Sequence, residues 1–286
     1  MIVILGPTAS GKTRYAVKMA CKCDGEILSA DSRQVYRGMD IGTGKDLSEY
    51  HCCGRDIPYH LIDIAEAGTK YNLFEYQRDF FKAFEDIHSR GKQPILCGGT
   101  GLYIEAVTKG YSLPEVPIDF QLREEFEKLS LKELAKKLTS VKRLHNTTDI
   151  DHKKRAIRAL EIALYAEKHP TGFTEYPKLK CRYIGILVER EERNRRIDIR
   201  LKQRLENGLV EEVKGLITNG IPPEKLIYYG LEYKFVTLYL TGQLSYKEMT
   251  EQLAIAIHQF AKRQMTWFRG MERRGVEIEW ITNIVY

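Results

Sequence analysis

Short apolar runs alternate with amphipathic segments along the first hundred residues. Residues 2–5 are uniformly apolar and end at a glycine, which is typical of a strand buried on both faces. Residues 26–29, 59–62 and 94–97 are expected to form further strands. Helices are expected at 12–21 and at 74–87, where apolar side chains recur at helical spacing. Strands that alternate with helices predict βαβ units and a mostly parallel sheet.

The pattern changes near Pro114 and Pro117. From 119 to 168 the chain reads as consecutive charged helices without a strand, and residues 183–188 then read as a strand that returns to the sheet. Helices at 190–217 and 245–269 and a last strand at 276–281 follow. We therefore predict an α/β core formed by residues 1–113 and 180–286, interrupted by a small all-helical insertion domain at 114–179.

The segment between the first strand and the first helix matches the phosphate-loop pattern G-x-x-x-x-G-K-[ST]. Its residues are Gly6, Pro7, Thr8, Ala9, Ser10, Gly11, Lys12 and Thr13. Backbone N–H groups of such a loop and the helix N-terminus surround a phosphate, and the lysine adds a positive charge. The Thr13 hydroxyl can be a ligand for Mg²⁺. This motif predicts a P-loop NTPase-like parallel sheet flanked by helices that binds a di- or triphosphate, and it leaves the reaction open.

One interpretation of this loop is that the protein is an ATPase or a small-molecule kinase. Such an enzyme needs an acidic residue at the end of an apolar strand, and Leu61-Ile62-Asp63 offers one. The strand at 94–97 is instead followed by Gly-Gly-Thr-Gly, without an acidic residue. The kinase hypothesis therefore remains open on the phosphate loop alone.

Composition excludes several classes of protein. Apolar residues make up 43% and charged residues 29%, as in an ordinary folded domain. No apolar run approaches the roughly 20 residues of a membrane-spanning helix, and the first residues do not resemble a signal peptide, so we expect a cytoplasmic protein without membrane contact. The six cysteines have no zinc-like spacing and are expected to be free thiols: Cys21, Cys23, Cys52, Cys53, Cys97 and Cys181.

Positive charge is concentrated in two segments. The formal net charge is +6, yet residues 132–158 and residues 178–204 each carry a net charge of +6, so the rest of the chain is acidic. Two basic segments on an otherwise acidic protein indicate a polyanionic partner. The simpler alternative is that both are solvated helix faces.

Three further motifs resemble those of a known family. Residues 31–36 read Asp-Ser-Arg-Gln-Val-Tyr and continue to Lys45, residues 98–103 read Gly-Gly-Thr-Gly-Leu-Tyr, and residues 261–269 read Ala-Lys-Arg-Gln-Met-Thr-Trp-Phe-Arg. Together with the phosphate loop they resemble the tRNA dimethylallyltransferases, also called isopentenyl-tRNA transferases. Weaker matches lie at 154–161 and 196–200, and the resemblance runs from Ile2 to Arg269.

The resemblance implies transfer of a dimethylallyl group from dimethylallyl diphosphate to N6 of the adenosine next to the anticodon on its 3′ side, giving N6-(dimethylallyl)adenosine. Asp31 matches the general base of the family, and Thr100 matches a position that contacts the extruded adenosine. The phosphate loop, Mg²⁺ and Arg200 would stabilise the leaving diphosphate. An adenine amino group is a poor nucleophile, so a base and a stabilised leaving group are what the reaction requires.

The resemblance also implies a set of residues that contact the anticodon stem-loop of tRNA. They are Asp31, Ser32, Arg33, Gln34, Thr100, Arg123, Lys154, Arg155, Arg158, Lys262, Arg263 and Arg269. Trp267 and Phe268 are expected to pack in the core, and the protein is expected to be a monomer.

The sequence departs from the family pattern at two places, and two alternative functions remain to be weighed. The insertion is shorter than in most members, and residues 229–232, Tyr-Gly-Leu-Glu, depart from the usual pattern. An adenylate (AMP) dimethylallyltransferase would share residues 6–13 and Asp31 but has no need of basic helices. A non-catalytic RNA-binding protein has no use for Lys12, Asp31 and Thr100 together.

Overall fold

The computed structural model describes residues 1–141, 150–169 and 175–282, and it divides into two compact units. The first comprises Met1–Gly110 and Lys178–Tyr286, and the second comprises Tyr111–Pro177. The boundaries expected from the sequence, after residues 113 and 179, fall close to these. Each unit is described here by itself.

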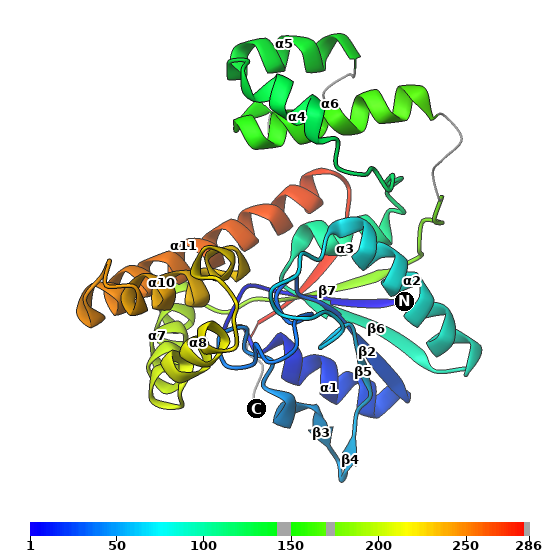
Figure 1. Ribbon diagram of the computed structural model, residues 1–286. Helices are drawn as coiled ribbons and strands as arrows, with labels where there is room; N and C mark the ends of the chain where they lie inside the picture. The colour runs from blue at the N-terminus through cyan, green and yellow to red at the C-terminus, as the bar shows by residue number, and fades with distance from the viewer. Residues whose placement is uncertain (142–149, 170–174, 283–286) are drawn as a thin grey trace. The chain divides into compact units, whose positions relative to one another are not determined.

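The first unit is built on a six-stranded sheet with the order β5-β2-β6-β1-β7-β8. All of its strand pairs are parallel. Helix α1 covers one face of this sheet, and α2 and α3 cover the other (Figure 1). The strands are β1 (Ile2–Leu5), β2 (Gly25–Ala30), β5 (Tyr59–His60), β6 (Gln93–Gly98), β7 (Arg182–Ile186) and β8 (Ile278–Ile281), and the helices are α1 (Lys12–Cys23), α2 (Leu73–Ser89) and α3 (Gly101–Thr108). The predicted α/β class with a parallel sheet is confirmed.

The core explains why the strands read as continuous apolar runs. Helices cover both faces of the sheet, so side chains on both sides of a central strand are buried. On the α1 face, Ile27, Ile95 and Ile184 pack with Ile4 and with Val17 of the helix, and all of them are nearly inaccessible to solvent. Removal of this apolar area from water is the main stabilising contribution to the core.

The remaining helices of the first unit pack against one another: α7 contacts α8 and α11, and α10 contacts α8 and α11. They are α7 (Arg190–Glu206), α8 (Leu209–Thr218), α9 (Pro223–Leu226), α10 (Leu231–Leu240) and α11 (Tyr246–Arg273). The single helix expected at 190–217 is wrong, because Gly208, with a φ of +99°, separates α7 from α8. Helix α10 was not expected. In the described part of the chain, no helix is long and apolar enough to cross a membrane.

The second unit is helical throughout its described residues. Its helices are α4 (Phe120–Glu127), α5 (Leu131–Val141) and α6 (Lys153–Lys168). They share a small core of their own, formed by Phe126, Leu134, Leu138, Ala156, Ile157, Leu160 and Ala163. The helical nature of the insertion thus agrees with the sequence pattern over the residues that the structure describes.

Candidate active site

The phosphate loop follows β1 and is shaped by its close contacts. A Cβ atom on Gly6 would lie 2.7 Å from Ser10 Oγ and 3.0 Å from the carbonyl oxygen of Ile186, so only glycine fits there. Ala9 and Gly11 have φ values of +60° and +80°, which turn the chain tightly into α1. The first turn of α1 carries Lys12 and Thr13.

Lys12 lies in a confined position that has little counter-charge. Its Nζ donates a hydrogen bond to the carbonyl oxygen of Pro7 at 3.5 Å. Burial lowers the pKa of Lys12, and the carboxylate of Asp31 opposes this shift only in part. A bound anion would restore the preference for the charged ammonium. The position is therefore suited to a phosphate group.

Asp31 and Thr100 follow the neighbouring strands of the same sheet. Strand β6 lies between β1 and β2, so the carboxyl ends of these three strands meet at one edge. The backbone N–H of Arg33 donates to Asp31 Oδ1 at 2.8 Å, and the N–H of Ser32 donates to Thr100 Oγ1 at 3.2 Å. These bonds fix the orientations of the carboxylate and the hydroxyl relative to each other.

A cavity of about 440 Å³ lies over this edge of the sheet. Its size is typical of pockets for small ligands. The predicted residues that line it are Thr8, Lys12, Thr13, Asp31, Ser32, Arg33, Gln34, Thr100, Arg200 and Arg263. The fold thus brings together residues far apart in the sequence, from the phosphate loop to α11, to line one cavity.

Helix α7 contributes two arginines to this cavity. Arg200 pairs with Asp46 and also reaches the carbonyl oxygen of Gly44, and Arg204, one turn further on, pairs with Glu232 at 3.2 Å. Burial lowers the pKa of Arg204 and raises that of Glu232. Arg204 and Glu232 were not predicted as site residues. The four-residue spacing of Arg204 from Arg200 was the available signal.

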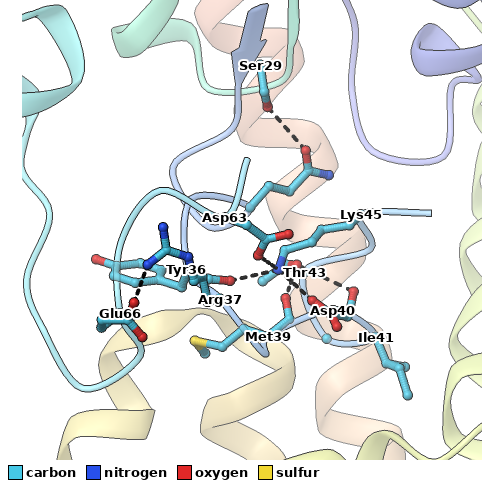
Figure 2. Close-up of polar contacts among 12 residues, drawn as sticks. Ser29, Tyr36, Arg37, Met39, Asp40, Ile41, Thr43, Lys45, Asp63 and Glu66 are labelled. Atoms are coloured by element: carbon cyan, nitrogen blue, oxygen red, sulfur yellow. Dashed lines mark hydrogen bonds and ion pairs between the residues drawn. The ribbon is translucent and has the colours of Figure 1, made fainter. Parts of the chain in front are cut away.

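The loop after Asp31 is held by a buried lysine. Lys45 is 2% exposed, and its Nζ donates to the carbonyl oxygen of Tyr36 at 2.7 Å and to the carboxylates of Asp40 and Asp63 (Figure 2). Asp63, the acidic residue that a kinase would need, is thus engaged in anchoring this loop and does not line the cavity. This arrangement argues against the kinase reading.

Gln34 also helps to anchor the loop. Its amide nitrogen donates to the carbonyl oxygen of Gly44 at 2.9 Å, and its amide oxygen accepts a hydrogen bond from Ser29 at 3.2 Å. Gln34 therefore lines the cavity with a side chain that is already bonded on both ends of its amide.

Helix α11 presents two different faces. Arg263, Gln264 and Trp267 line the cavity described above, whereas Lys262 and Arg269 line a separate cavity of about 840 Å³. Phe268 is buried as expected, but the core position expected for Trp267 is wrong. Trp267 is 39% exposed, packs against Gly101, and donates from Nε1 to Glu105 at 2.8 Å.

The basic residues expected in the insertion belong to the second unit and fall into two groups. Lys154 and Arg155 are exposed on α6. Arg123 and Arg158 both pair with Glu161, which is 2% exposed, and together they lower its pKa against the effect of burial. Arg123 and Arg158 thus have a structural role in this unit.

Comparisons with known proteins identify the family of the chain. The family model described as IPP transferase matches residues 34–271, and the model described as isopentenyl transferase matches residues 1–53. Over 281 residues the chain is 59% identical to the tRNA dimethylallyltransferase 1 of Parabacteroides distasonis, covering 98% of this chain and 92% of that protein. It is 60% identical to the tRNA dimethylallyltransferase 2 of Porphyromonas gingivalis, with coverages of 98% and 93%.

Solved structures show the same fold. The full-length tRNA isopentenylpyrophosphate transferase of Bacillus halodurans superposes with a TM-score of 0.70 at 33% identity, covering 98% of this chain and 89% of that one. A eukaryotic dimethylallyltransferase acting on tRNA, 24% identical, superposes with a TM-score of 0.77 and covers 99% of this chain and 73% of its own, which bears on the fold alone. The chain therefore belongs to the IPP transferase family and is a prenyl-transferring enzyme.

Proposed function

We propose that the protein transfers a dimethylallyl group from dimethylallyl diphosphate to N6 of the adenosine next to the anticodon, on its 3′ side, in tRNA. The observation that carries this proposal is the meeting of Lys12, Asp31 and Thr100 in one cavity at the ends of three neighbouring strands. The names of the relatives, tRNA dimethylallyltransferases at 59–60% identity, support the substrate class.

Asp31 is the proposed general base. In the reaction the bond between N6 and C1 of the prenyl group forms, the bond between C1 and the diphosphate oxygen breaks, and the N6 proton passes to the carboxylate. Because the Arg33 N–H holds Oδ1 at 2.8 Å, the carboxylate is oriented before substrate binds. Such a base contributes about 10²–10⁴ to the rate. The Thr100 hydroxyl lies beside it and would orient the adenine.

The leaving diphosphate gains negative charge as the C–O bond breaks. Lys12, the N–H groups of residues 6–13 and Arg200 are the proposed groups that stabilise it. The pairing of Arg200 with Asp46 holds its guanidinium at the cavity wall. Charged groups fixed in advance need no reorganisation during the reaction.

A Mg²⁺ ion fits this donor set. The Thr13 hydroxyl is a hard oxygen donor at the cavity wall beside Lys12, and Mg²⁺ in phosphate sites is held by few protein ligands and by substrate oxygens. Thr13 would hold the ion, which supplies charge neutralisation to the diphosphate when bound.

The acceptor adenosine has to leave the stack of the anticodon loop to enter a cavity of this kind. We propose that the basic residues of the second unit, Lys154 and Arg155 among them, contact phosphates of the anticodon stem. A monomer is sufficient for this arrangement, since a single chain carries both the cavity and the basic helices.

The test is transfer of radiolabel from dimethylallyl diphosphate in the presence of Mg²⁺, with unmodified tRNA and AMP offered in parallel. Asp31→Asn is the informative variant, because its amide oxygen can still accept the Arg33 N–H bond. We expect label on tRNA, reduced about 10²–10⁴-fold in the variant with little change in donor binding. Label on AMP alone would assign the protein to adenylate prenylation, and label on neither would refute the proposal.

A further inference from the structure

Cys21 and the consecutive pair Cys52 and Cys53, about 30 residues apart in the sequence, meet on the surface of the first unit. Cys21 lies near the end of α1, Cys52 ends the short strand β3 (His51–Cys52), and Cys53 begins the turn to β4 (Arg55–Asp56). All three sulfur atoms lie within 4.8 Å of one another, and those of Cys52 and Cys53 are 3.5 Å apart. We propose that Cys21, Cys52 and Cys53 bind one thiophilic metal ion, Zn²⁺ or Cu⁺, through three thiolates.

The spacing of the sulfur atoms fits such an ion. With metal–sulfur bonds of about 2.3 Å, tetrahedral or trigonal geometry places neighbouring sulfurs about 3.8–4.0 Å apart. The cluster needs only small adjustments to reach these values. Thiolates select soft ions such as Zn²⁺ and Cu⁺ over Mg²⁺, so this site and the phosphate site would take different metals.

The backbone at Cys53 explains how two consecutive cysteines can be ligands of the same metal ion. Successive side chains in an extended strand point to opposite faces. Cys53 has a φ of +55° and Gly54 a φ of +75°, so the chain reverses in a tight turn and the two sulfurs approach each other. Positive φ at both residues between the paired strands β3 and β4 is the geometry of a two-residue hairpin turn.

The surroundings of the three thiols suit a bound ion. Cys21 and Cys52 are partly buried against the core, whereas Cys53 is exposed, so an ion can enter from solvent. Arg55 donates to the carbonyl oxygen of Cys21 at 2.8 Å. Its positive charge, which it shares with Asp24 at 3.6 Å, lies near the net negative charge of an ion held by three thiolates. The ion would tie the end of α1 to the β3–β4 hairpin.

The experiment uses the reduced full chain and titrates it with Co²⁺, then with Zn²⁺ in competition, and separately with Cu⁺ in the presence of a chelator. We expect one ion per chain and thiolate-to-cobalt charge-transfer absorption. Cys21→Ser, Cys52→Ser and Cys53→Ser should each weaken binding by more than about 100-fold, beyond the loss seen when only a hydrogen-bond partner of a ligand is removed. Cys23→Ser is the matched control, since this exposed thiol lies on the same helix but outside the cluster.

A second measurement needs no variant. Alkylation of the wild-type protein, mapped by mass spectrometry, should show Zn²⁺ or Cu⁺ protecting the three clustered cysteines and leaving Cys23 reactive. Binding of Cu⁺ alone would assign the site to copper. Failure of all three ions to bind the reduced chain, equal binding in Cys21→Ser, or equal alkylation with and without metal would overturn the proposal. None of these outcomes depends on prenyl transfer.

Discussion

The backbone N–H of Thr8 donates to the side-chain oxygen of Gln264 at 2.8 Å, which joins the phosphate loop to α11 across 256 positions of sequence. The amide nitrogen of the same side chain donates to the carbonyl oxygen of Gly99 at 3.0 Å. One glutamine thus fixes the phosphate loop relative to the loop that carries Thr100.

Replacement of Gln264 should therefore impair catalysis more than folding. In Gln264→Glu the carboxylate can still accept from Thr8, but it cannot donate to Gly99 and it places negative charge beside the phosphate site. The loss of a buried hydrogen bond, about 1–3 kcal/mol, predicts a roughly 10- to 100-fold lower rate of single-turnover transfer. Gln252→Glu, on an exposed turn of the same helix, is the control. Equal rates in both variants would contradict the assignment.

A comparison of alanine substitutions at Gly44 and Gly38 distinguishes the effect of backbone strain from the effect of displacing Arg200 and Arg204. A Cβ atom at Gly44, where φ is +63°, would collide with the guanidinium groups of Arg200 and Arg204, whereas Gly38, with a φ of +68°, has nothing within 4 Å. Alanine at either position costs roughly 1–2 kcal/mol of backbone strain. Only Gly44→Ala should also raise KM for dimethylallyl diphosphate, by about 10- to 100-fold. Steady-state kinetics of both variants, with thermal unfolding, measure the difference.

The stability of the first unit should fall in acid because of Glu26. Arg90 and His60 hold its carboxylate and lower its pKa to about 2. A carboxyl group with a depressed pKa stabilises the fold above its ordinary pKa of about 4.3, and this contribution is lost as the pH falls towards 2. Allowing for the solvent exposure of Arg90, we expect a loss of about 2 kcal/mol.

Urea unfolding between pH 7 and pH 2 tests this expectation. Glu26→Gln should be less stable at pH 7 and should show a flatter pH dependence below 5. Glu279→Gln, which removes an exposed partner of Arg182 on an edge strand, should leave the profile close to that of the wild type. A Glu26→Gln profile that keeps the wild-type slope would show that another group controls acid unfolding.

Two basic residues of α6 should differ in role, one in tRNA binding and the other in the stability of the second unit. Lys154 is exposed, so Lys154→Gln should leave Tm unchanged and weaken tRNA binding with a salt dependence smaller by about one charge. Arg158 pairs with the buried Glu161, so Arg158→Gln should destabilise the second unit by about 1–3 kcal/mol. Filter binding at several salt concentrations and thermal unfolding distinguish them. A Tm that falls equally in both variants would contradict this division.

Local pattern was sufficient for much of the fold. The apolar run at 2–5 predicted β1, the helical spacing of apolar residues at 74–87 predicted α2, and the phosphate loop identified its own strand and helix. These features depend on neighbours within a few residues, so they are readable from sequence. The break between α7 and α8 was missed although Asn207-Gly208 is a turn signal, and α10 was missed although Gly230 and Gly242 bound its apolar pattern.

The sequence by itself determined the family: the phosphate loop and the motifs at 31–36, 98–103 and 261–269 identified it, and the proposed roles of Asp31, Thr100 and Arg200 followed from that resemblance. Only the tertiary structure decided which other residues lie beside them. The insertion of β6 between β1 and β2 brings Asp31 beside Thr100, the packing of α7 and α10 adds Arg204 and Glu232, and the hairpin at Cys53 completes a thiol cluster with Cys21. The physical reason is that motifs record contacts along the chain, whereas strand order and helix packing depend on burial of apolar faces between distant segments.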